Sequence, residues 1–241
     1  MLPAMSSTST DLPPPSVHRL PAARLVDRVA EVTALVRGKS VIDLGFVDEG
    51  RLLSKYDHGI WLHEQVAAEA RTAVGIDADE AGVARARELG FSAHAADVED
   101  AGSLAGLGVE PAEVVLAGEL LEHLDRPGAF LDAVKHLVAP GGSLVLTTPN
   151  GHALTNVLAG IVGRELVNPD HVGWFSWRTL VTLLGRHGWR VESVSYYPFP
   201  RVQSGAAAPR VAFNTYQALL RPVFRLRPNL ADGIIVVATR A

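Results

Sequence analysis

The sequence contains no cysteine, no long apolar run and no excess of basic residues. Without cysteine there are no disulfides, no thiolate nucleophile and no cysteine-ligated metal. No apolar stretch approaches about 18 residues, so we expect no membrane-spanning helix. The net charge of -4 does not favour nucleic acid, and we expect no nucleic-acid partner. A basic start followed by an apolar core is also missing, which predicts a cytoplasmic protein without a secretory signal.

The remaining composition is typical of a globular enzyme. The 241 residues are 48% hydrophobic and 20% charged, which is enough to build one domain with a large core. Residues 1–16 are rich in Ser, Thr and Pro, and we predict that they form a flexible tail. We expect residues 17–241 to form a single domain.

Short apolar runs alternate with segments of helical periodicity, which is typical of a parallel sheet with helices on both faces. We therefore predict an α/β fold with a Rossmann-like, doubly wound, mostly parallel seven-stranded sheet and an antiparallel edge strand. The last two strands are expected to pair around a long insert. The expected strands are residues 40–44, 73–77, 91–95, 111–117, 143–148, 189–196 and 233–239, and the expected helices are 17–37, 61–71, 80–89, 128–138 and 175–187.

Three apolar runs end in a carboxylate or a glycine. The first ends in Asp43-Leu44-Gly45, the second in Asp77, and the third in Asp97-Val98. In a parallel sheet, ligands bind just beyond the carboxyl ends of the strands. The acidic side chains can accept hydrogen bonds from ribose hydroxyls and a base amine, which favours a nucleoside-bearing cofactor. Singly, each feature is equally explained by a turn, a helix cap or a surface ion pair.

The first loop lacks a glycine-rich dinucleotide fingerprint, because Val47 follows Gly45 where a second glycine is usual. Without G-x-G-x-x-G, a nicotinamide-dependent oxidoreductase is disfavoured. The irregular loop also keeps open a non-catalytic, Rossmann-like nucleoside-binding or scaffold protein. The following segment, His58 to His63, either forms a wall of the cofactor pocket or contributes Trp61 to the core.

Two carboxylates and an imidazole follow the fourth strand in the run Glu119-Leu120-Leu121-Glu122-His123. On a helix, positions i, i+3 and i+4 share one face, so these three side chains are expected to converge near the cleft. One interpretation is general-base chemistry by His123. Another is a divalent metal bound by Glu119, Glu122 and His123. The third is a partly solvated helix start, in which His123 only packs.

His171 lies in a polar loop that enters the helix at 175–187, with Ser176 as a plausible N-cap. Its position between turn residues and aromatic residues suggests a lid over an acceptor site. The alternative is a loop histidine satisfied by backbone groups.

In their order and spacing, these motifs resemble those of class I S-adenosylmethionine-dependent methyltransferases. The likeness covers about residues 40–196 and includes Gly118 to Leu124, Leu137 to Leu144 and Thr147-Thr148-Pro149-Asn150. Within that superfamily, Glu-Leu-Leu-Glu-His and the late His171 are similar to ubiquinone-biosynthesis O-methyltransferases. They are equally similar to methyltransferases of bacterial glycan and natural-product pathways.

The resemblance implies S-adenosyl-L-methionine as the cofactor and also supports a divalent cation such as Mg²⁺ at Glu119, Glu122 and His123. The chain departs from the family pattern in the missing second glycine, which leaves the methionine carboxylate without an assigned partner. The implied cofactor contacts are Gly45 for the methionine part, Asp77 for the ribose, Asp97 and Val98 for adenine, and Gly118 and Glu119 beside the sulfonium. Asp43 is also expected to bind the cofactor, without an assigned part.

We therefore predict methyl transfer to an oxygen, rather than a nitrogen, of a small metabolite or glycan. His123 or His171 is expected to act as the base, while Glu119 orients the cofactor or acceptor. Residues 152–230 are expected to supply the acceptor-side insertions and lid. The segment 219–227 mixes apolar and basic residues, which allows peripheral contact with a membrane or an amphipathic cover over the sheet. A homodimer is one expected assembly.

Overall fold

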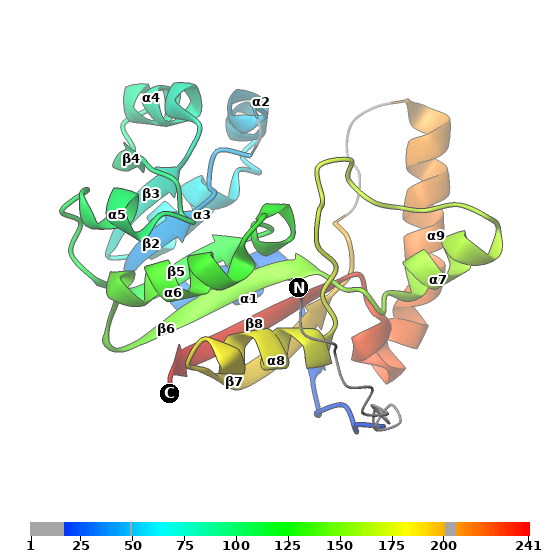
Figure 1. Ribbon diagram of the computed structural model, residues 1–241. Helices are drawn as coiled ribbons and strands as arrows, with labels where there is room; N and C mark the ends of the chain where they lie inside the picture. The colour runs from blue at the N-terminus through cyan, green and yellow to red at the C-terminus, as the bar shows by residue number, and fades with distance from the viewer. Residues whose placement is uncertain (1–16, 49, 201–205) are drawn as a thin grey trace, which may run out of the picture.

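One mixed sheet runs through the computed structural model, which describes residues 17–48, 50–200 and 206–241 (Figure 1). The predicted tail at residues 1–16 lies outside the described residues. From one edge to the other, the strands are β1 (Arg24–Leu25), β7 (Trp189–Tyr197), β8 (Gly233–Arg240), β6 (Val138–Pro149), β5 (Ala112–Gly118), β2 (Ser40–Leu44), β3 (Thr72–Asp77) and β4 (Ala93–Ala95).

Helices cover both faces of this sheet. Neighbouring strand residues point to opposite faces, so Val41 and Ile42 belong to different core clusters. The face of Val41 is covered by α1 (Arg28–Val36) and α3 (Leu62–Glu69), and the face of Ile42 by α5 (Ala101–Ala105), α6 (Pro127–Ala133) and α8 (Trp177–Arg186).

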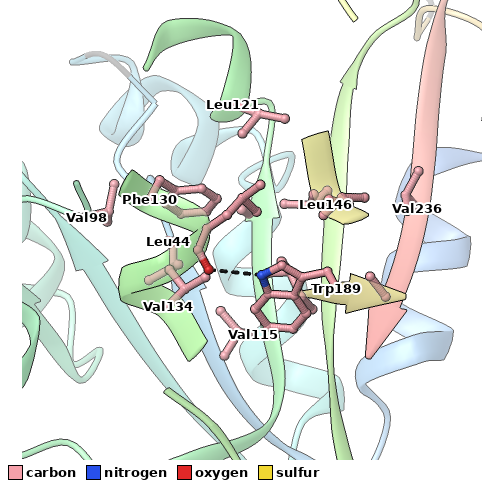
Figure 2. Packing of buried hydrophobic residues seen from close by; sticks show 14 of the residues in the cluster. Leu44, Val98, Val115, Leu121, Phe130, Val134, Leu146, Trp189 and Val236 are labelled. Atoms are coloured by element: carbon pink, nitrogen blue, oxygen red, sulfur yellow. Dashed lines mark hydrogen bonds between the residues drawn. The ribbon is translucent and has the colours of Figure 1, made fainter. Parts of the chain in front are cut away.

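The core on the second face is closed by aromatic side chains (Figure 2). Phe130 and Val134 pack in the same cluster as Val115 of β5. The indole Nε1 of the buried Trp189 donates a hydrogen bond to the carbonyl of Leu131 at 3.0 Å. The indole N–H is thereby satisfied within an apolar environment, which avoids the cost of a buried unpaired donor.

The predicted fold class is confirmed, but the antiparallel strand does not lie at the edge. β8 is antiparallel to both β6 and β7 and lies between them. Its residues Ile234, Ile235 and Val236 are all buried. A strand that is apolar on both faces is stable only where both faces are covered, and an interior position provides that cover. The short strand β1 brings the total in the described residues to eight.

The helix predicted at residues 17–37 is also shorter than expected. Arg24 and Leu25 pair with β7 as an additional parallel strand, and the helix begins only at Arg28. Asp27 caps it, because its side chain accepts a hydrogen bond from the backbone N–H of Ala30 at 3.0 Å. The apolar spacing of this segment therefore reflects a strand followed by a helix.

The remaining helices agree with the sequence to different degrees. Ser176 caps α8 as expected, and Asp79 caps α4 (Glu80–Glu88). The helix expected at 128–138 ends at Ala133 and continues as the 3-10 turn η2 (Val134–Leu137). No described helix has both the length and the apolarity needed to cross a membrane. The other elements are α2 (Leu52–Asp57), η1 (Leu121–His123), α7 (Leu154–Ile161), α9 (Ala207–Leu226) and η3 (Pro228–Leu230).

Candidate functional site

A cavity of about 600 Å³ opens at the carboxyl ends of β2, β3 and β5. It brings together most of the residues that the strand ends predict. Asp43 does not line it. Asp43 instead lines a second cavity of about 710 Å³, and both cavities share Arg28, Gly45 and Gly118 in their walls. The predicted residues in the first cavity are Gly45, Asp77, Asp97, Val98, Gly118, Glu119, Glu122, His123 and His171.

Asp77 organises the turn that follows β2. Its Oδ2 accepts a hydrogen bond from the backbone N–H of Val47 at 3.0 Å, and its Oδ1 accepts one from Asp79 at 2.9 Å. Burial raises the pKa of Asp77, and these two hydrogen bonds oppose part of that rise. Each carboxylate oxygen can accept a second hydrogen bond, so Asp77 retains capacity for two ligand hydroxyls.

Gly45 and Asp97 take equally defined positions. Gly45 has φ of +69°, a conformation that glycine adopts without steric cost, and its N–H donates to the carbonyl of Ile76 at 2.9 Å. Asp97 Oδ1 accepts a hydrogen bond from the backbone N–H of Glu99 at 2.8 Å. The backbone at these strand ends is therefore fixed before any ligand binds.

Glu119 lies at the centre of a polar cluster near the end of β5. Its Oε1 accepts hydrogen bonds from the hydroxyl of Tyr197 and from Thr147 Oγ1, the latter at 3.0 Å. Arg28 Nε donates to Thr147 Oγ1 at 3.1 Å, and its guanidinium lies 5.9 Å from the centre of the Tyr197 ring. Side chains of α1, β6 and β7 thus hold one carboxylate at the cavity wall.

The charged groups of this cluster change one another's pKa values. Burial lowers the pKa of Arg28, but the interactions with Glu119, Tyr197, Asp48 and Glu122 together outweigh it, so the pKa is raised overall. Burial and the charge of Glu119 also raise the pKa of the Tyr197 hydroxyl well above its ordinary value. Tyr197 therefore remains protonated and donates to Glu119 throughout the physiological pH range.

A second cluster contains Glu122, His123 and His171, whose ligand atoms all lie within 4.8 Å of one another. The two imidazole rings are perpendicular, with 4.6 Å between their centres. Thr148 Oγ1 donates to Glu122 Oε2 at 2.9 Å, whereas the buried Oε1 makes no hydrogen bond with a described residue. Burial, together with the nearby Glu119 carboxylate, raises the pKa of Glu122 from 4.5 to about 8.

The expected helical face of Glu119, Glu122 and His123 is not present. Glu119 has φ of +54°, so the chain turns sharply there before the 3-10 turn η1 begins at Leu121. This turn separates Glu119 from the other two side chains, and His171 takes its place in the cluster. Spacing in the sequence could not reveal this, because it assumes a continuous helix from Glu119 onward.

His171 reaches the cavity through a loop that is attached to Glu122. The N–H groups of Val172 and Gly173 both donate to the carbonyl oxygen of Glu122, at 2.9 and 3.0 Å. The loop is therefore attached to η1, and His171 lines the cavity, while its role as a lid residue stays a prediction.

Comparison with known proteins now identifies the family. Residues 17–194 match a family model described as a methyltransferase domain. This chain belongs to the class I S-adenosylmethionine-dependent methyltransferases. A ubiquinone biosynthesis O-methyltransferase of Paraburkholderia phytofirmans is 30% identical over 153 residues, which are 63% of this chain and 60% of that protein. The corresponding protein of Thiobacillus denitrificans is 31% identical over 154 residues, with the same two shares.

The chain thus spans about three fifths of the length of these curated relatives. Solved structures share the fold at low sequence identity. A SAM-dependent methyltransferase from Archaeoglobus fulgidus has a TM-score of 0.53 and 18% identity, covering 88% of this chain and 91% of its own. A magnesium protoporphyrin IX methyltransferase from Synechocystis PCC 6803, solved with bound SAH, has a TM-score of 0.54 and 14% identity, covering 88% and 82%.

After β2, this methyltransferase has Val47 where a second glycine is usual, and Val47 packs in one apolar cluster with Phe46 and Trp61. Trp61 is fully buried, and its Nε1 donates to the carbonyl of Phe46 at 2.8 Å. The alternative in which Trp61 belongs to the core is therefore correct. Next to it, the buried pair of Asp43 and His63 is joined by a 2.8 Å hydrogen bond between Oδ2 and Nδ1.

Sequence reasoning missed Arg28 and Tyr197, and it gave Thr147 no role in the site. All three depend on contacts between distant segments of the methyltransferase, and Arg28 and Thr147 are 119 positions apart. An arginine at the start of a helix that lies beside the first strand was the available signal for Arg28. No local pattern marks the other two.

Proposed function

We propose that this methyltransferase transfers a methyl group from S-adenosyl-L-methionine to an oxygen of a small metabolite or glycan. The supporting observation is that one cavity contains two sets of residues with different chemistry. Asp77, Asp97 and Val98 form the first set, called here the adenosine side. The second set, called the transfer side, consists of Glu119, Glu122, His123 and His171.

In this proposal the adenosine side binds the nucleoside. Asp77 accepts hydrogen bonds from the ribose hydroxyls, Asp97 accepts one from the exocyclic amine of adenine, and the backbone of Val98 contacts the base. The methionine part then passes Gly45 and Gly118 toward the second cavity. Arg28 lines both cavities, and its guanidinium supplies the missing partner for the methionine carboxylate.

The chemistry on the transfer side consists of alignment and proton removal. The acceptor oxygen attacks the methyl carbon, the carbon–sulfur bond breaks, and its electron pair remains on sulfur as S-adenosylhomocysteine is formed. The proton of the acceptor passes to an imidazole, either His123 or His171, both of which line the cavity. Glu119, held by Tyr197, orients the reacting groups.

The choice of an oxygen acceptor is supported by the curated relatives, whose names describe O-methyltransferases. The acceptor-facing residues come from 152–230, which include α7, α9 and the loop that carries His171. The matches to those relatives cover about three fifths of their length, so their substrates are not assigned to this chain.

The transfer side also fits a divalent cation. The orphaned Oε1 of Glu122 and the two imidazoles provide a mixed set of oxygen and nitrogen ligands. Two imidazoles favour Zn²⁺ over the Mg²⁺ expected from the resemblance. When bound, the metal would polarise the acceptor oxygen and so take the place of the imidazole base. Chelation followed by separate addition of Mg²⁺, Mn²⁺ and Zn²⁺ tests this fit by thermal shift, with His171→Ala as the variant that loses the response.

Isothermal calorimetry with S-adenosylmethionine and S-adenosylhomocysteine tests the proposed function. We expect dissociation constants of roughly 1–100 μM. Transfer of a labelled methyl group is then measured with a panel of phenolic, sugar and amine acceptors. Absence of heat with both ligands would exclude the proposal, and a response to NADH alone would favour the oxidoreductase. Cofactor binding without methyl transfer to any acceptor of the panel would favour the nucleoside-binding scaffold.

A further inference from the structure

The buried pair of Asp43 and His63 has no role in the proposed transfer. His63 lies in the first turn of α3, and Asp43 lies one residue before the end of β2. Their side chains are 0% and 4% exposed, and a 2.8 Å hydrogen bond joins His63 Nδ1 to Asp43 Oδ2. A polar pair withdrawn from water to this degree costs free energy, so its position requires an explanation.

Three aromatic rings hold the imidazole in place. The centres of Phe46, Trp61 and Phe91 lie 4.6, 5.1 and 5.5 Å from the centre of the His63 ring. Trp61 is itself fixed by its hydrogen bond to the carbonyl of Phe46. The imidazole therefore has one orientation, in which Nδ1 faces the carboxylate.

The hydrogen bonds of this imidazole indicate its charge. Nε2 of His63 is buried and makes no hydrogen bond with any described residue. In the neutral tautomer with hydrogen on Nδ1, Nε2 carries only a lone pair, whereas a protonated ring would bury a second N–H without an acceptor. An unsatisfied buried donor costs more than an unsatisfied weak acceptor. These surroundings thus favour a neutral His63 that donates to an ionised Asp43.

Asp43 and His63 both line the cavity that continues from the cofactor cleft past Gly45 and Gly118. Arg28 lies in the same wall. The methionine part of the cofactor carries a carboxylate and an α-ammonium group. A guanidinium and an ionised carboxylate in one cavity match these two opposite charges.

We propose that His63 is a positioning residue that fixes an ionised Asp43 as the partner of the cofactor's α-ammonium group. This inference rests on the proposed function, because it requires S-adenosylmethionine to occupy the cleft. The other charged residues that line this cavity are Asp27, Arg28, Asp48, Arg51 and Lys55. Asp77 lies close enough to Asp43 for their charges to interact.

The test compares two ligands that differ only at the amino-acid part. S-adenosylhomocysteine carries the α-ammonium group and the carboxylate, whereas 5′-methylthioadenosine lacks both. We expect His63→Leu to weaken S-adenosylhomocysteine about tenfold or more and 5′-methylthioadenosine less than about twofold, since one buried charge loses its donor. His63→Asn places an amide N–H near the position of Nδ1 and should restore most of the affinity.

The ratio of the two affinities supplies a readout that a purely structural role would not change. Affinity for S-adenosylhomocysteine, divided by that for 5′-methylthioadenosine, should fall about fivefold or more in His63→Leu and return most of the way to the value of the unmodified protein in His63→Asn.

Equal weakening of both ligands by His63→Leu would overturn the inference, because it would indicate general damage to the fold. The same conclusion follows if His63→Asn behaves like His63→Leu. If the unmodified protein binds neither ligand, the proposed function fails first and this inference fails with it.

Discussion

On the adenosine side, the cleft is built from strand ends, and Asp77 and Asp97 bond to the backbone of nearby turns. On the transfer side, Glu119 is held by side chains from three separate elements, and the bond between Arg28 and Thr147 joins residues 119 positions apart. Backbone donors persist after most substitutions, whereas side-chain donors do not. The adenosine side should therefore tolerate changes in its surroundings, while the transfer side depends on individual side chains.

The largest effect is expected for Asp77→Ala, which tests the adenosine side directly. This change removes the proposed ribose acceptors and the partner of the Val47 N–H, so affinity for S-adenosylhomocysteine should fall at least about 100-fold, or about 3 kcal/mol. Calorimetry measures it. Asp97→Ala removes one contact to the base and should cost about tenfold. If Asp97 matters more than Asp77, the assignment of ribose and adenine is reversed.

On the transfer side, Tyr197→Phe should lower the free energy of unfolding by about 1.5–3 kcal/mol, because the ionised Glu119 loses a charge-assisted hydrogen bond. Urea denaturation measures the change. Tyr196→Phe is the matched control, since Tyr196 lies in the core cluster of the opposite face. Combining Tyr197→Phe with Glu119→Gln should be non-additive if the two residues act as a unit. Equal losses in the two tyrosine variants would contradict this account.

The raised pKa of Glu122 predicts how the stability of the metal-free protein depends on pH. Its pKa is raised to about 8 by burial, so the folded state binds a proton that the unfolded state has lost above about pH 4.5. Stability should therefore be full below pH 4.5 with respect to this group and fall as the pH rises through 8, by roughly 1–3 kcal/mol. Glu122→Gln should remove this slope. A slope unchanged in the variant would assign it to other groups.

The smallest effect on folding is expected on α9, whose backbone lies at the right of Figure 1, on the opposite side from β3, β4 and α4. Leu219 and Leu226 are 71% and 78% exposed, and Arg221, Arg225 and Arg227 lie in the same segment. Replacing both leucines by Asn should change stability by less than about 0.5 kcal/mol. If the segment contacts membranes, the same change should abolish co-sedimentation with anionic vesicles. Absence of co-sedimentation in the unmodified protein would exclude peripheral contact.

The sequence predicted the strand ends well because their signals are local. An apolar run followed by Asp or Gly marks both the end of a strand and the position of its last side chain, so Asp77 and Asp97 could be placed in one cleft. The helix caps Asp79 and Ser176 are equally predictable from the sequence, since a cap depends on residues within one turn.

The remaining features depend on pairing between distant segments. The interior position of β8 follows from its partners β6 and β7, although its unbroken apolar run was a usable hint. Arg28, Tyr197 and His63 become functional candidates only after folding brings them beside Glu119 or Asp43. The helix assumed from Glu119 onward does not form, because Glu119 has a positive φ. A non-glycine residue rarely adopts that conformation, so nothing in the sequence gives a reason to expect it there.

Asp232 has a consequence for how such a protein can diversify. It lies directly before β8 and accepts hydrogen bonds from Thr155 Oγ1 and from the N–H of Phe199, at 2.5 and 2.8 Å. One buried carboxylate thus anchors the two segments that leave the sheet after β6 and after β7. Because both excursions return to a common anchor, their outer parts can be lengthened, shortened or exchanged without disturbing strand register. New acceptor preferences can then evolve on an unaltered nucleotide-binding frame.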